Sequence, residues 1–212
     1  AIIGYGELIR EELGDSDPRE LAESADRLLD SADRLLQLVD RILQMTNLEA
    51  GATHVRSGPV PIPALLAEVA RLIERSSGRR ENRLTWDCAA DLGVPRTDAT
   101  LLRSVLFNLV ENAHKFTTRG DVRMVARRDG PLLVVAVSDT GIGMSADELA
   151  RLFQPFTQLE SGFTRRFGGL GLGLALGRRY CQLLGGELAV RSEVGRGSQF
   201  EIRIPFELGD VA

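Results

Sequence analysis

Asp139 is the residue whose position in the sequence is most suggestive of chemistry, because two glycines, Gly141 and Gly143, follow it closely. The continuous apolar run at residues 132–137 predicts a buried strand that ends beside this carboxylate. A carboxylate in such a place can accept a hydrogen bond from an exocyclic amine in a mostly apolar pocket. The glycines let the backbone turn and let a ligand approach it. An ordinary Asp/Gly turn would give the same pattern.

A second polar group lies on a predicted helix that begins at Asp98. Asn108 and Asn112 are four residues apart and Lys115 follows three residues later, so the three side chains share one stripe of the helix. An amide oxygen can join phosphate oxygens around Mg²⁺, and a lysine supplies a positive charge for phosphates. A solvated helix face with incidental asparagines is the alternative. The residues expected to face a sheet are Leu102, Val105, Leu106, Leu109 and Ala113.

A third group consists of glycines at the start of a helix predicted over residues 172–184. Free backbone N–H groups and the positive end of the helix dipole favour an anion at such a place. Arg165 and Arg166 come just before the glycines and could meet phosphates, although two exposed loop arginines are the alternative. A dinucleotide-binding fold would require a preceding strand, whereas residues 157–171 show no periodicity.

These segments, taken in order, resemble a known set of motifs. Residues 108–117, 137–144 and 167–176 are similar to the N, G1 and G2 boxes of the sensor histidine kinases. That family belongs to a wider ATPase superfamily with gyrase, heat-shock chaperones and MutL. Residues 151–156 resemble the family's F box, and the whole resemblance runs from residue 1 to about residue 206.

The resemblance implies ATP and Mg²⁺ as cofactors and gives each polar residue a role. It implies that Asn112 holds the metal, that Asn108 lies beside the triphosphate, that Lys115 contacts phosphate and that Asp139 contacts adenine. Leu170 stands where the family most often has threonine, and we expect little effect because the backbone makes that contact. The remaining nucleotide-binding residues that it implies are Gly141, Gly143, Phe156, Arg165, Arg166, Gly169, Leu170, Gly171, Leu172 and Gly173.

Residues 1–50 predict a helical hairpin whose second helix has a regular heptad seam. A hairpin this narrow needs a partner, and a homodimer that forms a four-helix bundle is the simplest one. Packing of the seam on the second domain is the alternative. The seam consists of Leu21, Ala25, Leu28, Ala32, Leu35, Val39 and Ile42, and Leu29, Leu36 and Leu43 widen it.

This hairpin resembles the dimerisation and phosphoacceptor domain of histidine kinases, with one departure. In the family a His-Glu motif stands just ahead of a segment like residues 1–5. The only histidines here are His54 and His114, and neither matches that position. We therefore expect the acceptor histidine upstream of Ala1, no catalytic residue among these 212, and a chain that binds Mg·ATP without phosphorylating itself.

The expected fold class is α+β, with the hairpin at 1–50, a linker at 51–61 and an ATP-binding domain at 62–207. That domain should be an α/β sandwich, in which a mixed sheet carries helices on one face. Strands are predicted at residues 83–88, 121–126, 132–137, 187–192 and 198–204. Helices are predicted from Pro63, with Leu65, Leu66, Val69, Leu72 and Ile73 inward, from Asp98, from Ser145 to Phe153 and over 172–184.

Composition excludes several classes of function. The net charge of −4 gives no basic footprint for nucleic acid, and no apolar run approaches the roughly 20 residues that span a bilayer. Cys88 and Cys181 lack the spacing of a metal site and are expected to be buried thiols. The resemblance implies a cytoplasmic location and leaves open whether a longer parent protein is anchored in a membrane.

The activity that the resemblance implies is transfer of the ATP γ-phosphoryl group to a histidine, and from there to an aspartate of a response regulator receiver domain. Two other readings stay open at this point. One is a superfamily ATPase or serine-directed kinase, as in anti-sigma factors, which the heptad hairpin disfavours. The other is a non-enzymatic module in which ATP binding only gates a dimer interface.

Overall fold

The computed structural model describes residue 9 and residues 18–76, 82–155, 157 and 171–208. The chain divides into two compact units, Ala1–Ala52 and Thr53–Ala212, and each is described by itself. The first helix of the predicted hairpin, apart from Ile9, lies outside the described residues.

The first unit contains one long helix, α2, Pro18–Glu49, which begins at the predicted proline. It ends in a Schellman motif, in which Gly51 N–H donates to Leu48 O and Ala52 N–H donates to Asn47 O. Gly51 has φ 66°, a conformation that glycine adopts without steric cost. The glycine stop that the sequence indicates is therefore confirmed.

The apolar seam of α2 is exposed in the single chain. Among its described large apolar side chains, Leu29, at 59%, and Leu36, at 61%, are the most exposed. A helix that keeps such a stripe uncovered needs another surface to bury it. The other exposed members are Leu35, Val39, Ile42 and Leu43.

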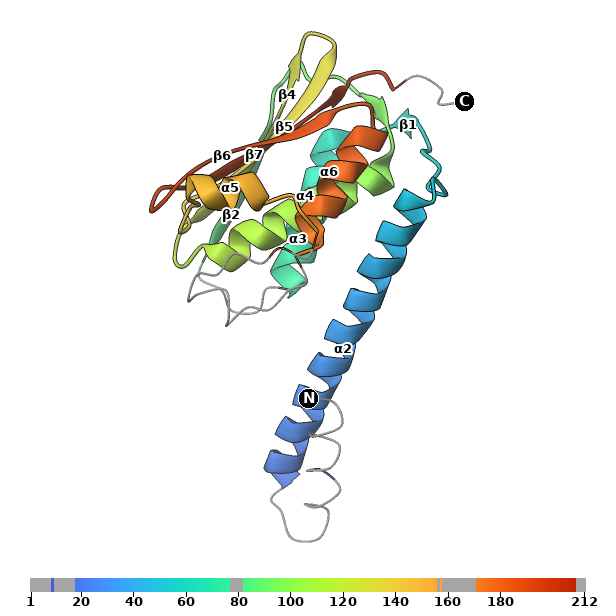
Figure 1. Ribbon diagram of the computed structural model, residues 1–212. Coiled ribbons are helices and arrows are strands. Elements are labelled where there is room, and N and C mark those ends of the chain that lie inside the picture. Colours follow the sequence, from blue (N-terminus) through green and yellow to red (C-terminus); the bar gives the residue numbers. More distant parts are fainter. Residues whose placement is uncertain (1–8, 10–17, 77–81, 156, 158–170, 209–212) are drawn as a thin grey trace. The chain divides into compact units, whose positions relative to one another are not determined.

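The second unit is built on a five-stranded mixed sheet with the strand order β2-β4-β5-β7-β6 (Figure 1). Only the β2–β4 pair is parallel, and the other three pairs are antiparallel. This confirms the expected α+β class and all five predicted strands. Their bounds are β2 Arg83–Cys88, β4 Asp121–Asp129, β5 Leu132–Asp139, β6 Glu187–Glu193 and β7 Gly197–Pro205.

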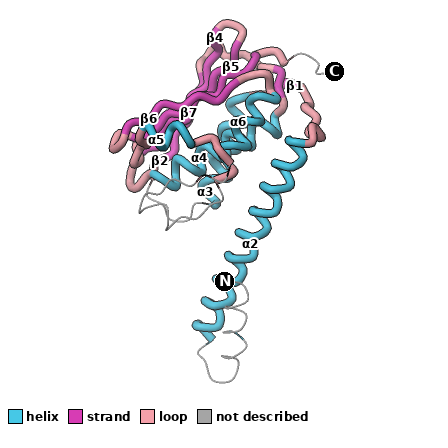
Figure 2. The backbone as a smooth tube through the Cα atoms, viewed as in Figure 1, coloured by secondary structure: helices cyan, strands magenta, loops and turns pink. Residues whose placement is uncertain are grey.

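Three helices cover one face of this sheet: α3 Ile62–Ser76, α4 Ala99–Phe116 and α6 Gly173–Leu183 (Figure 2). The period-2 pattern of β4 explains why, because Val122, Met124 and Ala126 point to that face and are fully buried. All five residues of α4 that were expected to face the sheet are buried as well. The short helix α5, Ala146–Arg151, follows the capping box that Ser145 and Glu148 form.

Four details of the predicted helices were wrong. Helix α3 begins one residue before Pro63, α5 ends at Arg151 rather than at Phe153, and α6 is one residue shorter at each end. Leu72, expected inward, is 38% exposed. Helix α3 contacts β2, which is an edge strand, so the sheet does not extend far enough to cover this side chain.

Residues 53–61, which we assigned to a linker, make contacts within the second unit. Here β1, Gly58–Pro59, pairs antiparallel with β3, Arg96–Thr97. Val60 is buried, and its N–H donates to Pro95 O at 2.9 Å. The sequence did not predict this small sheet.

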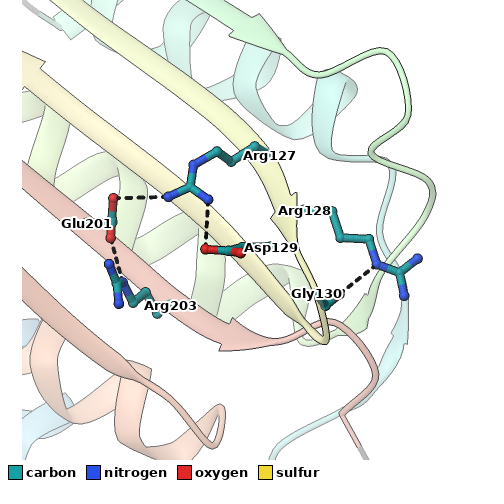
Figure 3. A network of polar contacts seen from close by, with 6 residues as sticks. All are labelled: Arg127, Arg128, Asp129, Gly130, Glu201 and Arg203. Carbon is teal, nitrogen blue, oxygen red and sulfur yellow. Dashed lines mark hydrogen bonds and ion pairs between the residues drawn. The ribbon is translucent and has the colours of Figure 1, made fainter.

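The opposite face of the large sheet carries charged side chains (Figure 3). Arg127 lies 3.0 Å from Asp129 and 3.6 Å from Glu201, and Glu201 also pairs with Arg203. Val134 is in register with both arginines and is only 1% exposed, although it lies on this face. The aliphatic stems of the arginines therefore shield it from water.

We expect Glu201→Gln to lower the free energy of unfolding by up to about 1 kcal/mol at low salt, because Glu201 is the shared partner of two arginines. The loss should shrink in about 1 M salt, where screening is stronger. The measurement is urea unfolding of wild type and variant, and the m value should be the same for both proteins. Glu193→Gln is the control, since its pair with Arg196 is mostly solvent-exposed. An equal effect of the two substitutions would contradict the shared-partner role.

Candidate functional site

Helix α4 carries the predicted amide pair, and its first turn is fixed by Asp98. The side-chain Oδ1 of this buried residue accepts from Thr100 N–H at 2.8 Å and from Leu101 N–H at 3.0 Å. Such an N-cap satisfies donors that the helix itself leaves free. Asn108, Asn112 and Lys115 are half-buried, in contrast with the fully buried inner face of the helix.

The last turn of α4 is held by Asn82, a residue that sequence reasoning missed. Its Nδ2 donates to His114 O at 3.0 Å and to Thr117 O at 2.9 Å, while Gly120 N–H donates to its Oδ1 at 3.3 Å. Asn82 therefore supplies donors to carbonyl groups at the C-terminal end of a helix. Its partners lie 32 and 35 residues further along, so no local signal could have identified it.

The loop that follows Asp139, residues 140–144, is called the Asp139 loop and lies against this same end of α4. Ile142 N–H donates to Phe116 O at 3.2 Å. A Cβ on Gly141 would lie 2.4 Å from that same oxygen, so a side chain there would require the loop to move. Since Phe116 follows Asn112 by one helical turn, the structure brings the Asp139 loop next to the turn that carries Asn112 and Lys115.

Gly143 is required by the packing of the chain itself. Its φ is 65°, and a Cβ on it would lie 1.9 Å from Glu193 O in the β6–β7 turn. That turn also holds the loop, because Gly195 N–H donates to Ile142 O and Met144 N–H donates to Ser192 Oγ. The sequence suggested that these glycines admit a ligand, whereas the closest contacts seen for Gly141 and Gly143 are with the protein's own backbone.

Asp139 is a half-buried carboxylate at the end of β5. Burial raises its pKa, and the N–H groups of Gly141 and Ser198 oppose that shift. The Gly141 N–H lies 2.8 Å from Oδ1. A carboxylate has about four acceptor positions, so this group retains the capacity to accept from an amine.

The start of α6 meets α4 one turn before Asn112. Asn108 Oδ1 lies 3.7 Å from the position that a Cβ on Gly173 would take. Leu172 is the N-cap and gives no side-chain hydrogen bond to the first turn of α6, so those N–H groups remain available to an anion. Gly171, with φ 67°, lies against the backbone of Thr157.

Helix α4 is thus common to all three predicted groups. Its contacts with Gly173 at Asn108 and with the Asp139 loop at Phe116 are eight residues apart, or about 12 Å along the helix axis. Asn112 lies between them, and the ammonium of Lys115 lies 5.1 Å from the Phe116 ring centroid. The arrangement offers a carboxylate loop, two amides, a lysine and a helix N-terminus at or next to the same helix.

Several predicted residues cannot be placed. Phe156, Arg165, Arg166, Gly169 and Leu170 lie outside the described residues, so their roles stay predictions. In the part of the chain that is described, no three His, Cys, Asp or Glu side chains are arranged to hold a metal ion. An amide oxygen such as that of Asn112, completed by phosphate and water oxygens, suits the reluctance of Mg²⁺ to lose its waters.

The histidines and cysteines show no sign of chemistry at this site. His114 is 5% exposed within α4, and His54 is exposed in the segment after α2. Burial raises the pKa of Cys181 to about 12, so its thiol is inert, as expected. Cys88 is only partly buried on β2.

Comparison with known families gives this geometry its context. Residues 97–208 match the family described as histidine kinase-, DNA gyrase B- and HSP90-like ATPase. That match covers more than half of the chain and contains α4, the Asp139 loop and α6. The chain belongs to this ATPase family. Residues 1–51 match the His Kinase A (phospho-acceptor) domain, and the two domains in this order are those of a sensor histidine kinase.

Curated relatives of this chain are also described as histidine kinases. An uncharacterized sensor-like histidine kinase of Rhizobium meliloti is 35% identical over 166 residues, which are 78% of this chain and 32% of the relative. The circadian input-output histidine kinase CikA of Synechococcus elongatus is 37% identical over 161 residues, covering 74% of this chain and 21% of the relative. The chain therefore spans about a third of the first relative's length and less of the second.

Solved structures show the same fold. Full-length ShkA in complex with AMPPNP aligns with a TM-score of 0.78 at 29% identity, covering 97% of this chain and 46% of ShkA. The catalytic domain of the histidine kinase ThkA aligns with a TM-score of 0.62 at 23% identity, covering 72% of this chain and 97% of that domain. Among the described residues of this kinase-like chain, no helix has the length and hydropathy to cross a membrane.

We expect Asp139→Asn to change how stability depends on pH. Because burial raises the folded-state pKa of Asp139 above its unfolded value, the native state binds more protons between the two values. The stabilisation that Asp139 contributes is thus fully present below its pKa in the unfolded state. It is lost as the pH rises through its higher pKa in the folded state. The variant should therefore be more stable than wild type at pH 7, with the difference narrowing towards pH 3.

Urea unfolding of both proteins across this pH range measures the difference. Asp129→Asn is the control, since Asp129 lies on the charged face and pairs with Arg127. A wild-type advantage at pH 7 would contradict the burial cost assigned to Asp139.

Proposed function

We propose that this chain binds Mg·ATP and supplies the γ-phosphoryl group for transfer to a histidine, and from there to an aspartate on a response regulator receiver domain. The observation that carries the proposal is that α4 contacts Gly173 through Asn108 and the Asp139 loop through Phe116. The family match over residues 97–208 supports nucleotide as the ligand of that arrangement.

Each residue of the site has a role that follows from its chemistry. Asp139 accepts a hydrogen bond from the adenine amine, and the polar stripe of Asn108, Asn112 and Lys115 faces the phosphates. The open first turn of α6 donates backbone N–H groups to the same phosphates. Arg165 and Arg166 are proposed to add positive charge.

Asn112 is the proposed protein ligand of Mg²⁺, through its amide oxygen. The chemistry that the bound ion supplies is neutralisation of phosphate charge. The residues of the chain hold the nucleotide, orient its γ-phosphate and stabilise negative charge. Phosphoryl transfer relies mainly on such positioning, so no side chain of the ATP-binding domain needs to act as a covalent nucleophile.

The exposed seam of α2 supports a homodimer in which two helical hairpins form a four-helix bundle. The match of residues 1–51 to a phospho-acceptor domain supports the same assignment. In this proposal neither His54 nor His114 is the phosphoryl acceptor, and the use of ATP places the domain in the cytoplasm.

We expect Asn112→Ala to weaken Mg²⁺-dependent binding of AMPPNP by at least about tenfold, because the amide oxygen is the protein's proposed metal ligand. The dissociation constant is measured for both proteins with Mg²⁺ and with EDTA. In wild type Mg²⁺ should tighten binding strongly, and in the variant much less. Thr100→Ala, an exposed change on the same helix, is the control and should behave as wild type. An equal effect of Mg²⁺ on wild type and Asn112→Ala would refute the metal role.

We also expect the 212-residue chain to acquire no acid-labile label from γ-labelled ATP. His114 is nearly inaccessible within α4, and His54 does not match the family's acceptor position. AMPPNP binding by the same sample serves as the control that the site is intact. A label that disappears in His54→Gln would identify an acceptor that the motifs do not predict.

A further inference from the structure

The segment that follows α2 in the chain, residues 53–60, is fastened to the rest of the second unit by a set of hydrogen bonds. Val60 N–H donates to Pro95 O at 2.9 Å, and Ser57 Oγ donates to Leu208 O at 3.2 Å. Arg96 in turn pairs with the C-terminal segment, since its N–H donates to Phe206 O and its carbonyl accepts from Leu208 N–H. We call residues 53–60 the connector.

Asp98 joins the connector to α4. Its Oδ1 accepts from the first turn of the helix, at Thr100 N–H and Leu101 N–H. Its Oδ2 accepts from Arg56 N–H on the connector at 2.7 Å. One carboxylate, 5% exposed, therefore binds two segments with one oxygen for each: the first turn of α4 and Arg56, which lies 42 residues before Asp98.

The helix beyond this cap is buried along its inner face. Leu102, Val105, Leu106 and Leu109 are at most 1% exposed, so its inner face is closely packed from the second turn onwards. Close-packed interiors transmit small displacements rather than absorbing them. A displacement at Asp98 is therefore expected to reach Asn108, where α4 meets Gly173, and Phe116, where it meets the Asp139 loop.

We propose that Asp98 is a positioning residue that couples the connector to the nucleotide site, so that the Arg56–Asp98 hydrogen bond and nucleotide binding strengthen each other. This inference rests on the proposed function, because it takes ATP as the ligand of α4. The coupling is reciprocal: nucleotide must tighten the connector by the same factor by which the connector tightens nucleotide.

The competing explanation is that Asp98 is only a helix cap and that the connector is a passive fastening. The two oxygens of Asp98 allow a separation of these roles. Asp98→Asn keeps an oxygen for Thr100 and Leu101, and asparagine caps helices as well as aspartate does. Its NH₂ group then faces Arg56 N–H, so two donors meet and only the connector bond is lost.

Arg56→Pro removes the same hydrogen bond from the other side, since proline has no N–H. Arg56→Ala is the matched control, because it removes the side chain and keeps the donor. Agreement between Asp98→Asn and Arg56→Pro would show that the bond itself is responsible. If Arg56→Pro does not fold, Asp98→Asn alone still decides the question.

The experiment uses the whole chain, with AMPPNP and Mg²⁺ as the probe. In wild type, nucleotide should slow amide hydrogen exchange at Arg56 by about fivefold, the lower end of measured couplings. In Asp98→Asn, exchange at Arg56 should be fast with or without nucleotide, while Thr100 and Leu101 stay protected. The dissociation constant of AMPPNP should rise by the same factor of about five, and Arg56→Ala should leave it unchanged.

The inference is overturned if Asp98→Asn binds AMPPNP as tightly as wild type, or if nucleotide leaves exchange at Arg56 unchanged in wild type. In both cases the proposed function stands, because wild type still binds nucleotide. Failure of wild type to bind AMPPNP at all would instead remove the proposed function, and the inference with it. A loss of protection at Thr100 in Asp98→Asn would assign its effect to the cap and also count against the coupling.

Discussion

The site depends on the hydrogen bonds that fix helix α4 at both ends. Asp98 holds its first turn, and Asn82 takes up carbonyl groups at its last turn, where Phe116 O also accepts from Ile142 N–H. A helix that is held at both ends has a fixed position, and its residues are spaced by the constant helical rise. The helical rise sets the spacing of Asn108, Asn112 and Lys115, and the hydrogen bonds at the two ends of α4 set where these residues lie in the domain.

The glycines near this helix meet two different demands. Gly143 has no room for a side chain, because the β6–β7 turn occupies that space, and Gly141 is equally confined by Phe116 O. A Cβ on Gly173 would meet only Asn108 at ordinary van der Waals distance. Packing thus explains the first two glycines without any ligand. At Gly173 packing imposes no such requirement, which favours a role in keeping the start of α6 open beside the amide.

Local signals in the sequence predicted much of the fold. The alternation of Val122, Met124 and Ala126 identified a strand and its buried face, and Asp98 identified the start of α4. Asn82 and the β1–β3 pair could not be found, because each is defined by partners more than 30 residues away. The motifs named the candidate site residues, whereas their convergence on α4 is a tertiary fact that spacing alone does not contain.

Two carboxylates on neighbouring strands of the sheet show how the chain distinguishes a binding group from a structural one. Glu201 on β7 lies between Arg127 and Arg203, so its charge is compensated within the protein. Asp139 on β5 has a raised pKa because of burial, and among the described residues the groups that counteract this rise are two backbone N–H groups. A half-buried carboxylate without a cation partner in the described part of the chain costs stability, and such costs are concentrated at functional sites. The free chain bears this cost before any ligand arrives, so the acceptor is already in place and already partly shielded from water when an amine donor reaches it.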